Sequence, residues 1–151
     1  MPTSPKVKRQ LLHVLSQNEI QGTICELGSG WGTLAFALAR RFPKCRIIAY
    51  ENSLVPYIYS QIYKLVIKTE NLHIKQENFF NALLSEADVI VCYLSPNIMA
   101  CLQPKLESEL RQGTLVLTNT FALPSWIPQQ TVEVEDLYGT KIYIYLNQNK
   151  I

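Results

Sequence analysis

The 151-residue sequence predicts an α/β protein with a seven-stranded, mostly parallel sheet, helices on both faces and a C-terminal antiparallel hairpin. Three observations predict this fold. Short apolar runs alternate with segments of helical periodicity, which is typical of parallel strands joined by helices. Residues 89–93 are continuously apolar, as in a strand that is buried on both faces. After residue 118 the helical periodicity ends, and two strand patterns follow around a short turn.

The first half of the chain is expected to hold two pairs of a strand and a helix behind an amphipathic helix. That first helix covers residues 5–16, whose apolar side chains share one side. Strands are expected at 23–27 and 46–50. The segment 33–42 has helical periodicity, and Pro43 ends it because proline cannot continue a helix.

The middle of the chain predicts two further helices and two further strands. Strands are expected at 72–76 and 89–93. The helix before them is indicated by apolar residues three or four positions apart: Leu54, Ile58, Ile62, Leu65 and Val66. The helix after them is indicated by leucines at steps of four and by a glycine beyond its end: Leu102, Leu106, Leu110 and Gly113.

The last part of the chain predicts strands without a helix. A strand is expected at 115–118, and the two prolines within 121–128 exclude a regular helix there. Strands at 131–135 and 141–146 make the hairpin, and 141–146 has apolar side chains on both faces, so it should lie inside the sheet. No repeat or linker interrupts this order, so we expect residues 1–151 to form one domain.

Composition and charge exclude several classes of protein. Apolar residues make up 48% of the chain, which is enough for a core and excludes a disordered chain. The longest apolar run has six residues, whereas a membrane-spanning helix needs about 20. Residues 1–20 lack the apolar core of a signal peptide. The net charge of +2 is too small to indicate a nucleic-acid partner. The four cysteines form no C-x-x-C pair, so no metal site is predicted, and a reducing cytoplasm is the expected location.

The glycine loop at 28–32 is the most informative motif, because it lies where a strand ends and a helix begins. Glycines permit a tight turn and let a ligand approach the backbone. Glu51 ends the next strand, 19 residues after Gly32, where a carboxylate can accept hydrogen bonds from the two hydroxyls of a ribose. Loop and acid together predict a cofactor that contains a ribose.

The spacing of the glycines favours one cofactor over another. Dinucleotide loops usually read G-x-G-x-x-G and seat a pyrophosphate. Here the spacing is G-x-G-x-G, and Glu26 precedes it by two positions. A carboxylate repels a pyrophosphate but attracts the ammonium of an amino acid. S-adenosylmethionine has a ribose, an adenine and an ammonium but no phosphate. The residues resemble motif I of the class I methyltransferases, whose Rossmann-like sheet also ends in a hairpin.

The resemblance assigns further roles near the adenine. In class I enzymes a polar residue after the third strand contacts the adenine amino group, and Asn78 takes the place of the usual Asp. Its amide oxygen can still accept a hydrogen bond. The loop, the two acids and this segment make up the expected cofactor-binding set: Glu26, Gly28, Ser29, Gly30, Gly32, Glu51, Asn52, Asn78 and Phe79. We have no functional interpretation of Trp31, which lies inside the loop.

The segment after the fourth strand, Tyr93-Leu94-Ser95-Pro96-Asn97, borders the transferring methyl group in class I enzymes. Enzymes that methylate amines of nucleic acids often carry Asn/Asp-Pro-Pro-aromatic there, and this sequence departs from that pattern. Tyr93, Ser95 and Pro96 are the expected catalytic residues, and Asn97 and Trp126 the expected substrate-binding residues. Tyr93 either orients the amine or only packs, and Trp126 either shapes an acceptor channel or only fills the core.

A longer resemblance covers almost the whole chain. The stretches YLSPNIMACLQPKLESELRQGTLV and FALPSW, with PTSPKV at the start, are similar to the small protein-lysine methyltransferases that modify the ATP synthase c subunit and the adenine nucleotide translocase. This resemblance implies attack of a neutral lysine amine on the sulfonium methyl group. The eukaryotic relatives carry a membrane-associating N-terminal segment that this sequence lacks, so the acceptor need not be the same.

Two alternatives stay open beside this function. One is a methyltransferase that acts on nucleic acid or on a small molecule. The other is a module that binds the cofactor without transferring its methyl group. On the preferred interpretation the partner is a protein with a target lysine, membrane-associated or not, and the chain is expected to be a monomer.

Overall fold

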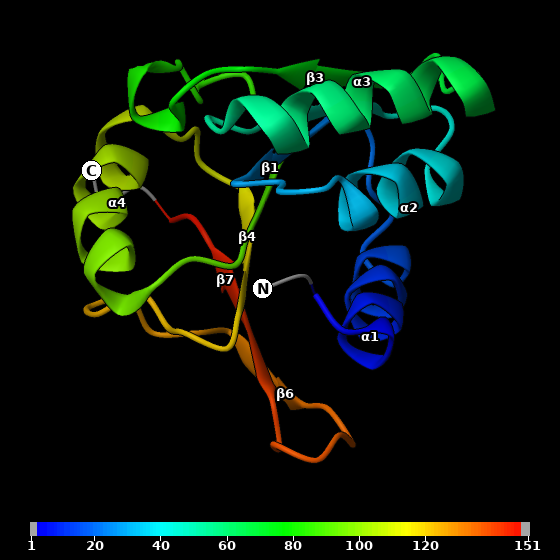
Figure 1. Cartoon of the computed structure of the whole chain (residues 1–151). Helices are drawn as coiled ribbons and strands as arrows, with labels where there is room; N and C mark the ends of the chain where they lie inside the picture. Colours follow the sequence, from blue (N-terminus) through cyan, green and yellow to red (C-terminus); the bar gives the residue numbers. More distant parts are fainter. Residues whose placement is uncertain (1–2, 149–151) are drawn as a thin grey trace.

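The computed structural model describes residues 3–148, and its centre is one seven-stranded sheet in the order β3-β2-β1-β4-β5-β7-β6 (Figure 1). Strands β1 to β5 run parallel, and β7 runs antiparallel to its neighbours β5 and β6. The prediction of a mostly parallel sheet with a terminal hairpin is therefore confirmed. The strands are β1 (Thr23–Leu27), β2 (Arg46–Tyr50), β3 (Leu72–Lys75), β4 (Val89–Cys92), β5 (Leu115–Asn119), β6 (Gln130–Glu133) and β7 (Lys141–Leu146).

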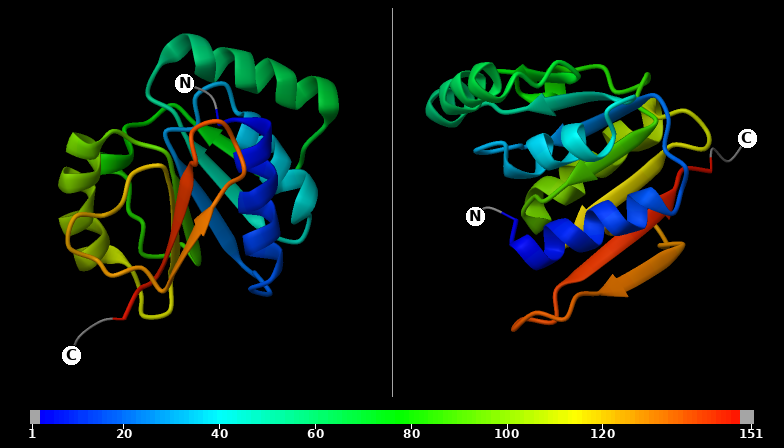
Figure 2. Two further views of the ribbon diagram at one scale, coloured as in Figure 1. Left: turned by 90° about the horizontal axis from the view of Figure 1, so that it is seen from below. Right: turned by 90° about the vertical axis from the view of Figure 1, so that its right-hand side faces the viewer.

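Helices cover both faces of the sheet (Figure 2). Helices α1, α2 and α3 pack on one face, while α4 and the short 3-10 helix η1 pack on the other. This division follows from right-handed crossovers, because the chain moves outward from β1 to β3 and then returns to add β4 and β5. The helices are α1 (Pro5–Ser16), α2 (Thr33–Arg41), α3 (Leu54–Ile67), η1 (Phe79–Asn81) and α4 (Pro96–Glu109).

The core has two layers, one on each face of the sheet. Leu11 and Leu38 are fully buried between the sheet and the first two helices. Leu102 and Tyr145 are fully buried on the opposite face, beneath α4. Strand β7 contributes to both layers, as the apolar residues on its two faces predict, and it lies inside the sheet between β5 and β6. None of the helices within residues 3–148 has the length and apolar character needed to cross a bilayer.

Helix α4 begins earlier than the leucine pattern alone indicates. Its first residue is Pro96, which suits this position because the first N–H of a helix needs no intrahelical partner. Strand β4 ends at Cys92, one residue before the expected end. Residues 93–95 are therefore the link between β4 and α4, at the carboxyl ends of the parallel strands.

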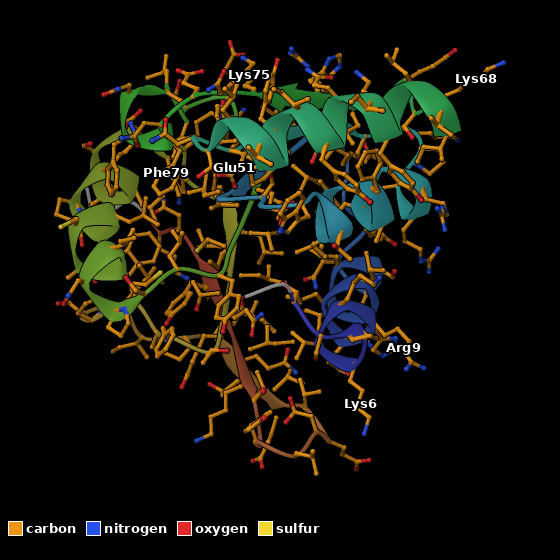
Figure 3. All side chains as sticks on the ribbon, in the orientation of Figure 1. Lys6, Arg9, Glu51, Lys68, Lys75 and Phe79 are labelled. Carbon is orange, nitrogen blue, oxygen red and sulfur yellow. The ribbon has the colours of Figure 1, made fainter. Side chains whose placement is uncertain are left out.

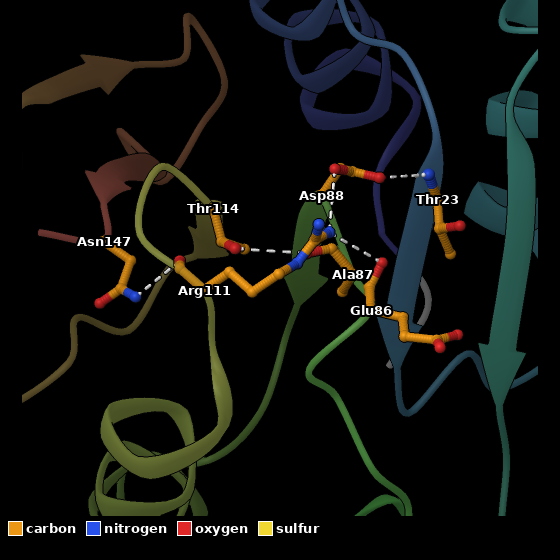
Figure 4. A network of polar contacts seen from close by, with 7 residues as sticks. All are labelled: Thr23, Glu86, Ala87, Asp88, Arg111, Thr114 and Asn147. Carbon is orange, nitrogen blue, oxygen red and sulfur yellow. Dashed lines mark hydrogen bonds and ion pairs between the residues drawn. The ribbon is translucent and has the colours of Figure 1, made fainter. Parts of the chain in front are cut away.

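The side of the sheet on which successive strands are added changes between β1 and β4. Strands β2 and β3 are added on one side of β1, and β4 and β5 on the other. In open parallel sheets, ligands bind at such a reversal, outside the carboxyl ends of the strands. The amino ends are closed by a polar network: Asp88 accepts hydrogen bonds from the Thr23 N–H at 2.8 Å and from Arg111 at 3.1 Å (Figure 4).

Candidate active site

The glycine loop turns sharply out of β1 and opens α2. Gly28, Gly30 and Gly32 all have positive φ angles, which side chains with a Cβ rarely adopt. A Cβ on Gly32 would also lie 2.9 Å from Oγ of Ser60 in α3. The N–H groups of Gly28 and Ser29 both donate to the carbonyl of Tyr50, at 3.0 and 2.9 Å. The loop is thus held against the carboxyl end of β2.

Glu51 connects this loop to the start of α3. Its Oε2 accepts a 2.6 Å hydrogen bond from the N–H of Gly30. Its Oε1 accepts a 2.9 Å hydrogen bond from the N–H of Ser53, the residue before α3. Figure 3 shows the Glu51 side chain beneath the first turns of α3, on the same side of the molecule as Lys75 and Phe79. The sequence placed this acid beside the loop, and the structure brings the two together.

A cavity of about 250 Å³ lies between the glycine loop and the ends of β4 and β5. It includes five of the residues predicted from the sequence: Glu26, Gly28, Ser29, Gly30 and Tyr93. Oε2 of Glu26 and Oγ of Ser29 are buried, and neither has a hydrogen-bond partner within the described part of the chain. Buried polar atoms of this kind normally bind a partner, so the cavity has the properties of a polar ligand site.

Glu26 is a buried acid whose surroundings favour its neutral form. It is 6% exposed, at the end of a strand inside the sheet. Burial, and next the negative charge of Glu51, raise the pKa of the Glu26 carboxyl to about 8. A cation in the cavity would oppose both effects and restore the ionised carboxylate. A ligand that carries an ammonium group would therefore shift Glu26 toward its ionised form.

The remaining predicted cofactor residues are not among those that form the cavity. Phe79 is buried in η1, and Asn78 precedes it and accepts a 3.0 Å hydrogen bond from the N–H of Phe80. Asn52 is exposed beyond Glu51, and Gly32 is buried beneath α3. Their cofactor-binding roles therefore stay predictions.

The predicted acceptor-side residues lie around the start of α4. Tyr93 is half-buried, and its ring stacks on that of Phe121 with centroids 6.5 Å apart. Ser95 ends the link before the helix, Pro96 and Asn97 begin its first turn, and all three are exposed. Pro96 fixes the direction in which the helix leaves the link, and the other two side chains face solvent, where an incoming acceptor can reach them.

Trp126 lies elsewhere. Its ring packs against the core layer beneath α4 and meets the ring of Tyr145 edge-to-face, with centroids 6.0 Å apart. Its indole N–H donates a 2.9 Å hydrogen bond to Glu107 of α4. It lines a separate hollow with residues such as Ile127 and Leu146, not the cavity at the glycine loop. The structure does not bring it together with the other predicted site residues.

Several residues of the cavity were not selected from the sequence. Asn119 is a buried polar residue at the end of β5, and Thr3, from the segment before α1, also lines the cavity. A polar residue at the end of an apolar strand is a signal that could have selected Asn119. No comparable signal marks Thr3, because its position depends on how α1 packs. Trp31 lines the cavity as well, and its ring meets Tyr59 of α3 edge-to-face at 5.3 Å.

Comparison with known proteins agrees with this geometry. Residues 26–130 match the model of the ANTKMT methyltransferase domain. The chain belongs to this methyltransferase family. The matched residues include the glycine loop, Glu51 and the link between β4 and α4, which the structure brings together at the carboxyl edge of the sheet.

Similar proteins show how far the likeness extends beyond this domain. A protein-lysine N-methyltransferase of Saccharolobus islandicus (strain REY15A) is 31% identical, over 97% of this chain and 91% of the relative. A lysine N-methyltransferase of Rattus norvegicus, named for the ATP synthase c subunit, is 27% identical, over 87% of this chain and 61% of the rat protein. An RNA methyltransferase of Salinibacter ruber, crystallised with S-adenosyl-L-homocysteine, superimposes with a TM-score of 0.85 at 27% identity and covers 100% of this chain and 96% of that one.

The family identifies the cofactor as S-adenosylmethionine, and the residues of this methyltransferase fit it. The buried acid Glu26 suits the ammonium group of the methionine part. Glu51 suits the ribose hydroxyls, since each carboxylate oxygen can accept a second hydrogen bond. No phosphate has to lie beside these two acids, as it would with a dinucleotide.

Proposed function

We propose that this methyltransferase transfers methyl groups from S-adenosylmethionine to lysine side chains of a protein. The observation that carries the proposal is the likeness to the Saccharolobus protein-lysine methyltransferase, which spans nearly the whole of both chains. The rat relative, named for lysine methylation of an ATP synthase component, supports the same acceptor chemistry. A module that binds the cofactor without transfer has less support, because both relatives are named as transferases.

On this proposal, the cofactor is held by the two acids and the glycine loop. Glu26 binds the methionine ammonium, while Glu51 accepts hydrogen bonds from the ribose. The loop lines the cavity with Gly28, Ser29 and Gly30, and the two glycines, which have no side chain, let the ligand approach the backbone closely. Asn52, Asn78 and Phe79 extend the site toward the adenine, and Gly32 keeps α2 and α3 close behind it.

The bound cofactor supplies an electrophilic methyl group on a sulfonium sulfur. The chain's own residues must then bring a neutral amine into line with that methyl group, because positioning accounts for much of the acceleration. The apolar rings of Tyr93 and Phe121 favour the neutral form of a lysine by lowering its pKa. We assign the orientation of the amine to the Tyr93 hydroxyl, with Ser95, Pro96 and Asn97 shaping the approach.

The test is transfer of a radiolabelled methyl group from S-adenosylmethionine into a lysate of the source cells. The labelled product is split into one sample treated with protease and one treated with ribonuclease. We expect the label to be lost with protease and retained with ribonuclease, and mass spectrometry to find the methyl groups on lysine. The Glu51→Ala variant is the control for background labelling.

Three results would contradict the proposal. Label that is sensitive to ribonuclease would favour RNA as the acceptor, the chemistry for which the Salinibacter protein is named. Label in neither protein nor RNA would favour a small molecule. If purified protein binds the cofactor but labels nothing in any fraction, the module without transfer activity becomes the better interpretation.

We further propose that the protein acts in the cytoplasm as a monomer. The cysteines Cys25, Cys45, Cys92 and Cys101 are all free, and three of them are buried, which suits a reducing compartment. Sedimentation of the purified protein tests the monomer, and fractionation of source cells tests the location.

A further inference from the structure

Helix α3 presents an unusually apolar face to solvent. Eight large apolar or aromatic side chains are exposed on it: Leu54, Val55, Ile58, Tyr59, Ile62, Tyr63, Leu65 and Val66. The side turned toward the sheet is mixed, because Tyr57 and Ile67 pack against the core layer beside polar residues. Ser60 is its only buried residue, and Gln61 donates hydrogen bonds to the Tyr57 hydroxyl and to the carbonyl of Ile74. A surface helix normally has the opposite arrangement, with its apolar side toward the core.

The exposed side chains form one continuous surface. The rings of Tyr59 and Tyr63 stack in parallel with centroids 6.3 Å apart, and Trp31 of the glycine loop meets Tyr59 edge-to-face. We call these eight residues and Trp31 the α3 apolar face. In Figures 1 and 2, α3 lies on the outside of the molecule next to β3, and the exposure of its side chains makes the α3 apolar face part of the surface.

Basic residues outnumber acidic ones in the part of the chain that contains this face. Residues 31–75, which span α2, β2, α3 and β3, hold seven of the 14 Lys and Arg but two of the 12 Asp and Glu. Lys64 is the single charged residue of α3. Lys68 and Arg40 line a hollow at the far end of α3, and Lys75 lies near its start (Figure 3). Of the two acids, Glu51 is engaged in the site through both of its oxygens, and Glu70 lines the same hollow as Lys68 and Arg40, where the basic residues still outnumber it.

We propose that the α3 apolar face docks this protein onto the surface of an anionic lipid bilayer, with α3 lying along the membrane plane. An apolar helical face among Lys and Arg is the pattern of a helix that lies in the interface. Tyr and Trp side chains favour that depth because their rings are both apolar and polar. At about 1.5 Å per residue, the 14 residues of α3 are too short to cross the bilayer but long enough to lie along it.

A bilayer surface accounts for two features together, the α3 apolar face and the basic residues near the ends of α3. Anionic headgroups attract the lysines, and the acyl region accepts the aliphatic side chains. Docking does not depend on the acceptor or on methyl transfer. The α3 apolar face shares only Trp31 with the lining of the cavity, and Tyr93 is not part of it.

Vesicle flotation of the full chain without cofactor tests this proposal. Vesicles of phosphatidylcholine alone are compared with vesicles that also contain phosphatidylglycerol, at low and high salt. We expect binding to the anionic vesicles, weakened by salt because screening reduces the attraction. The double variant Leu65→Gln/Val66→Gln should bind roughly tenfold or more weakly, because it removes two apolar side chains from the interface. Lys68→Gln should bind about fivefold more weakly.

The variants are expected to fold normally, and the chain offers a matched control. Leu65 and Val66 are 78% and 71% exposed, so polar replacements remove little core packing. Leu83→Gln/Leu137→Gln changes two exposed leucines outside α3, and its binding should equal that of the unchanged protein. Circular dichroism confirms the fold of each variant. Failure to float with anionic vesicles, or equal flotation of both double variants, overturns the proposal. A dimer that the Leu65/Val66 variant abolishes also overturns it, and assigns the face to a second copy.

Discussion

The N–H of Gly30 donates a 2.6 Å hydrogen bond to Oε2 of Glu51, and this bond fixes the glycine loop against the end of β2. The other carboxylate oxygen accepts the N–H of Ser53, so one acid positions both the loop and the first turn of α3. The residue assigned to the ribose is therefore also the residue that holds the loop beneath the cofactor. Its side chain is in place before a ligand binds, which lowers the entropy cost of binding.

Replacing Glu51 is expected to weaken cofactor binding. Glu51→Ala removes both the acceptor for the ribose and the anchor of Gly30, and hydrogen bonds to a charged group contribute about 1.5–3 kcal/mol each. We predict at least a tenfold loss of affinity for S-adenosylhomocysteine by calorimetry. Glu51→Gln should lose less, because its amide oxygen can still accept one N–H.

The exposed acid Glu86, which lies near the amino ends of the strands, provides the control. Glu86→Gln removes the same charge and should leave the affinity unchanged. If Glu51→Ala binds S-adenosylhomocysteine normally, or if the unchanged protein binds NAD with comparable affinity, the assignment of the ribose to Glu51 is wrong.

Glu26 is expected to make the stability of the ligand-free protein depend on pH. Its pKa is raised in the fold to about 8, so the neutral form is favoured by folding. That contribution is complete below the ordinary pKa of a glutamate, near 4.3, and is lost as the pH rises through the folded value. We predict a melting temperature that falls from pH 6 to pH 9, and a flatter profile for Glu26→Gln.

Another acid gives the opposite dependence and serves as an internal comparison. Hydrogen bonds from the side chain and the N–H of Thr140 lower the pKa of Asp136, so its contribution is lost only on acidification and does not change between pH 6 and 9. Saturating S-adenosylmethionine should reduce the slope of the unchanged protein, because its ammonium group favours ionised Glu26. A slope that persists in Glu26→Gln would assign it to other groups.

The sequence predicted the parts of the site that depend on local structure. A strand that ends in G-x-G-x-G must turn sharply, and an acid at the end of the neighbouring strand must lie at the same edge of the sheet. These two facts predict that Glu26 and Glu51 lie beside the loop, which is where the structure has them, and their roles toward the cofactor stay predictions. Asn119 and Thr3 reach the cavity through the packing of β5 and of the segment before α1. The polar end of an apolar strand marks Asn119, and the PTSPKV segment contains Thr3, but neither pattern gives the place of the residue in the fold. Trp126 lies on a loop without regular structure, and its position follows from the space beneath α4.

The orientation of α3 shows a different limit of prediction from the sequence. Residues such as Ile58 and Ile62 recur at helical spacing, and this periodicity correctly predicts a helix. Periodicity does not say which side of the helix meets the sheet. That choice is made by the side on which Ser60 is buried against Gly32, Gln61 bonds to the edge strand β3, and Tyr57 and Ile67 pack against the core. The tertiary contacts, and not the apolar pattern, orient this helix.

Tyr93→Phe tests the acceptor side of the site. The phenylalanine ring should keep the stacking on Phe121 while the hydroxyl that orients the amine is lost. We predict unchanged affinity for S-adenosylhomocysteine and a fall in kcat of roughly tenfold to a hundredfold, the value of a well-placed hydrogen bond to a charged transition state. The control is Tyr138→Phe, an exposed tyrosine in the hairpin turn. Equal kcat values for the two variants would show that Tyr93 contributes only packing and does not orient the amine.

Trp126→Ala is expected to lower stability first. The change removes an indole that packs against Tyr145 and breaks the hydrogen bond to Glu107. Truncating a large aromatic side chain of the core costs about 3–5 kcal/mol, and this one is only partly buried, so we expect a smaller loss that still lowers the melting temperature by several degrees. Glu107→Gln keeps the packing and should cost little. A stable Trp126→Ala protein with reduced transfer would instead support a role in the acceptor channel.

The network around Asp88 should contribute to stability without affecting the site, since it lies at the amino ends of the strands. Its carboxylate accepts the Thr23 N–H and the Arg111 guanidinium, which also donates to the carbonyls of Glu86 and Ala87 (Figure 4). The side chains of Asp88 and Arg111 are 41% and 56% exposed, so solvent weakens the ion pair to about 1 kcal/mol or less. The hydrogen bond from the Thr23 N–H contributes more to the free energy of unfolding, because Asp88→Ala leaves this N–H half-buried without this acceptor.

The expected free energies follow from that difference. Asp88→Ala should lower the unfolding free energy by about 1–2 kcal/mol, whereas Asp88→Asn, which keeps an acceptor for Thr23, should recover most of the loss. In a double-mutant cycle with Arg111→Ala, the coupling should stay below about 1 kcal/mol. Urea unfolding measures all of these values, and calorimetry should find cofactor affinity unchanged in each folded variant. A larger coupling would show that the ion pair, and not the hydrogen bond to the start of β1, holds the amino-end edge of the sheet.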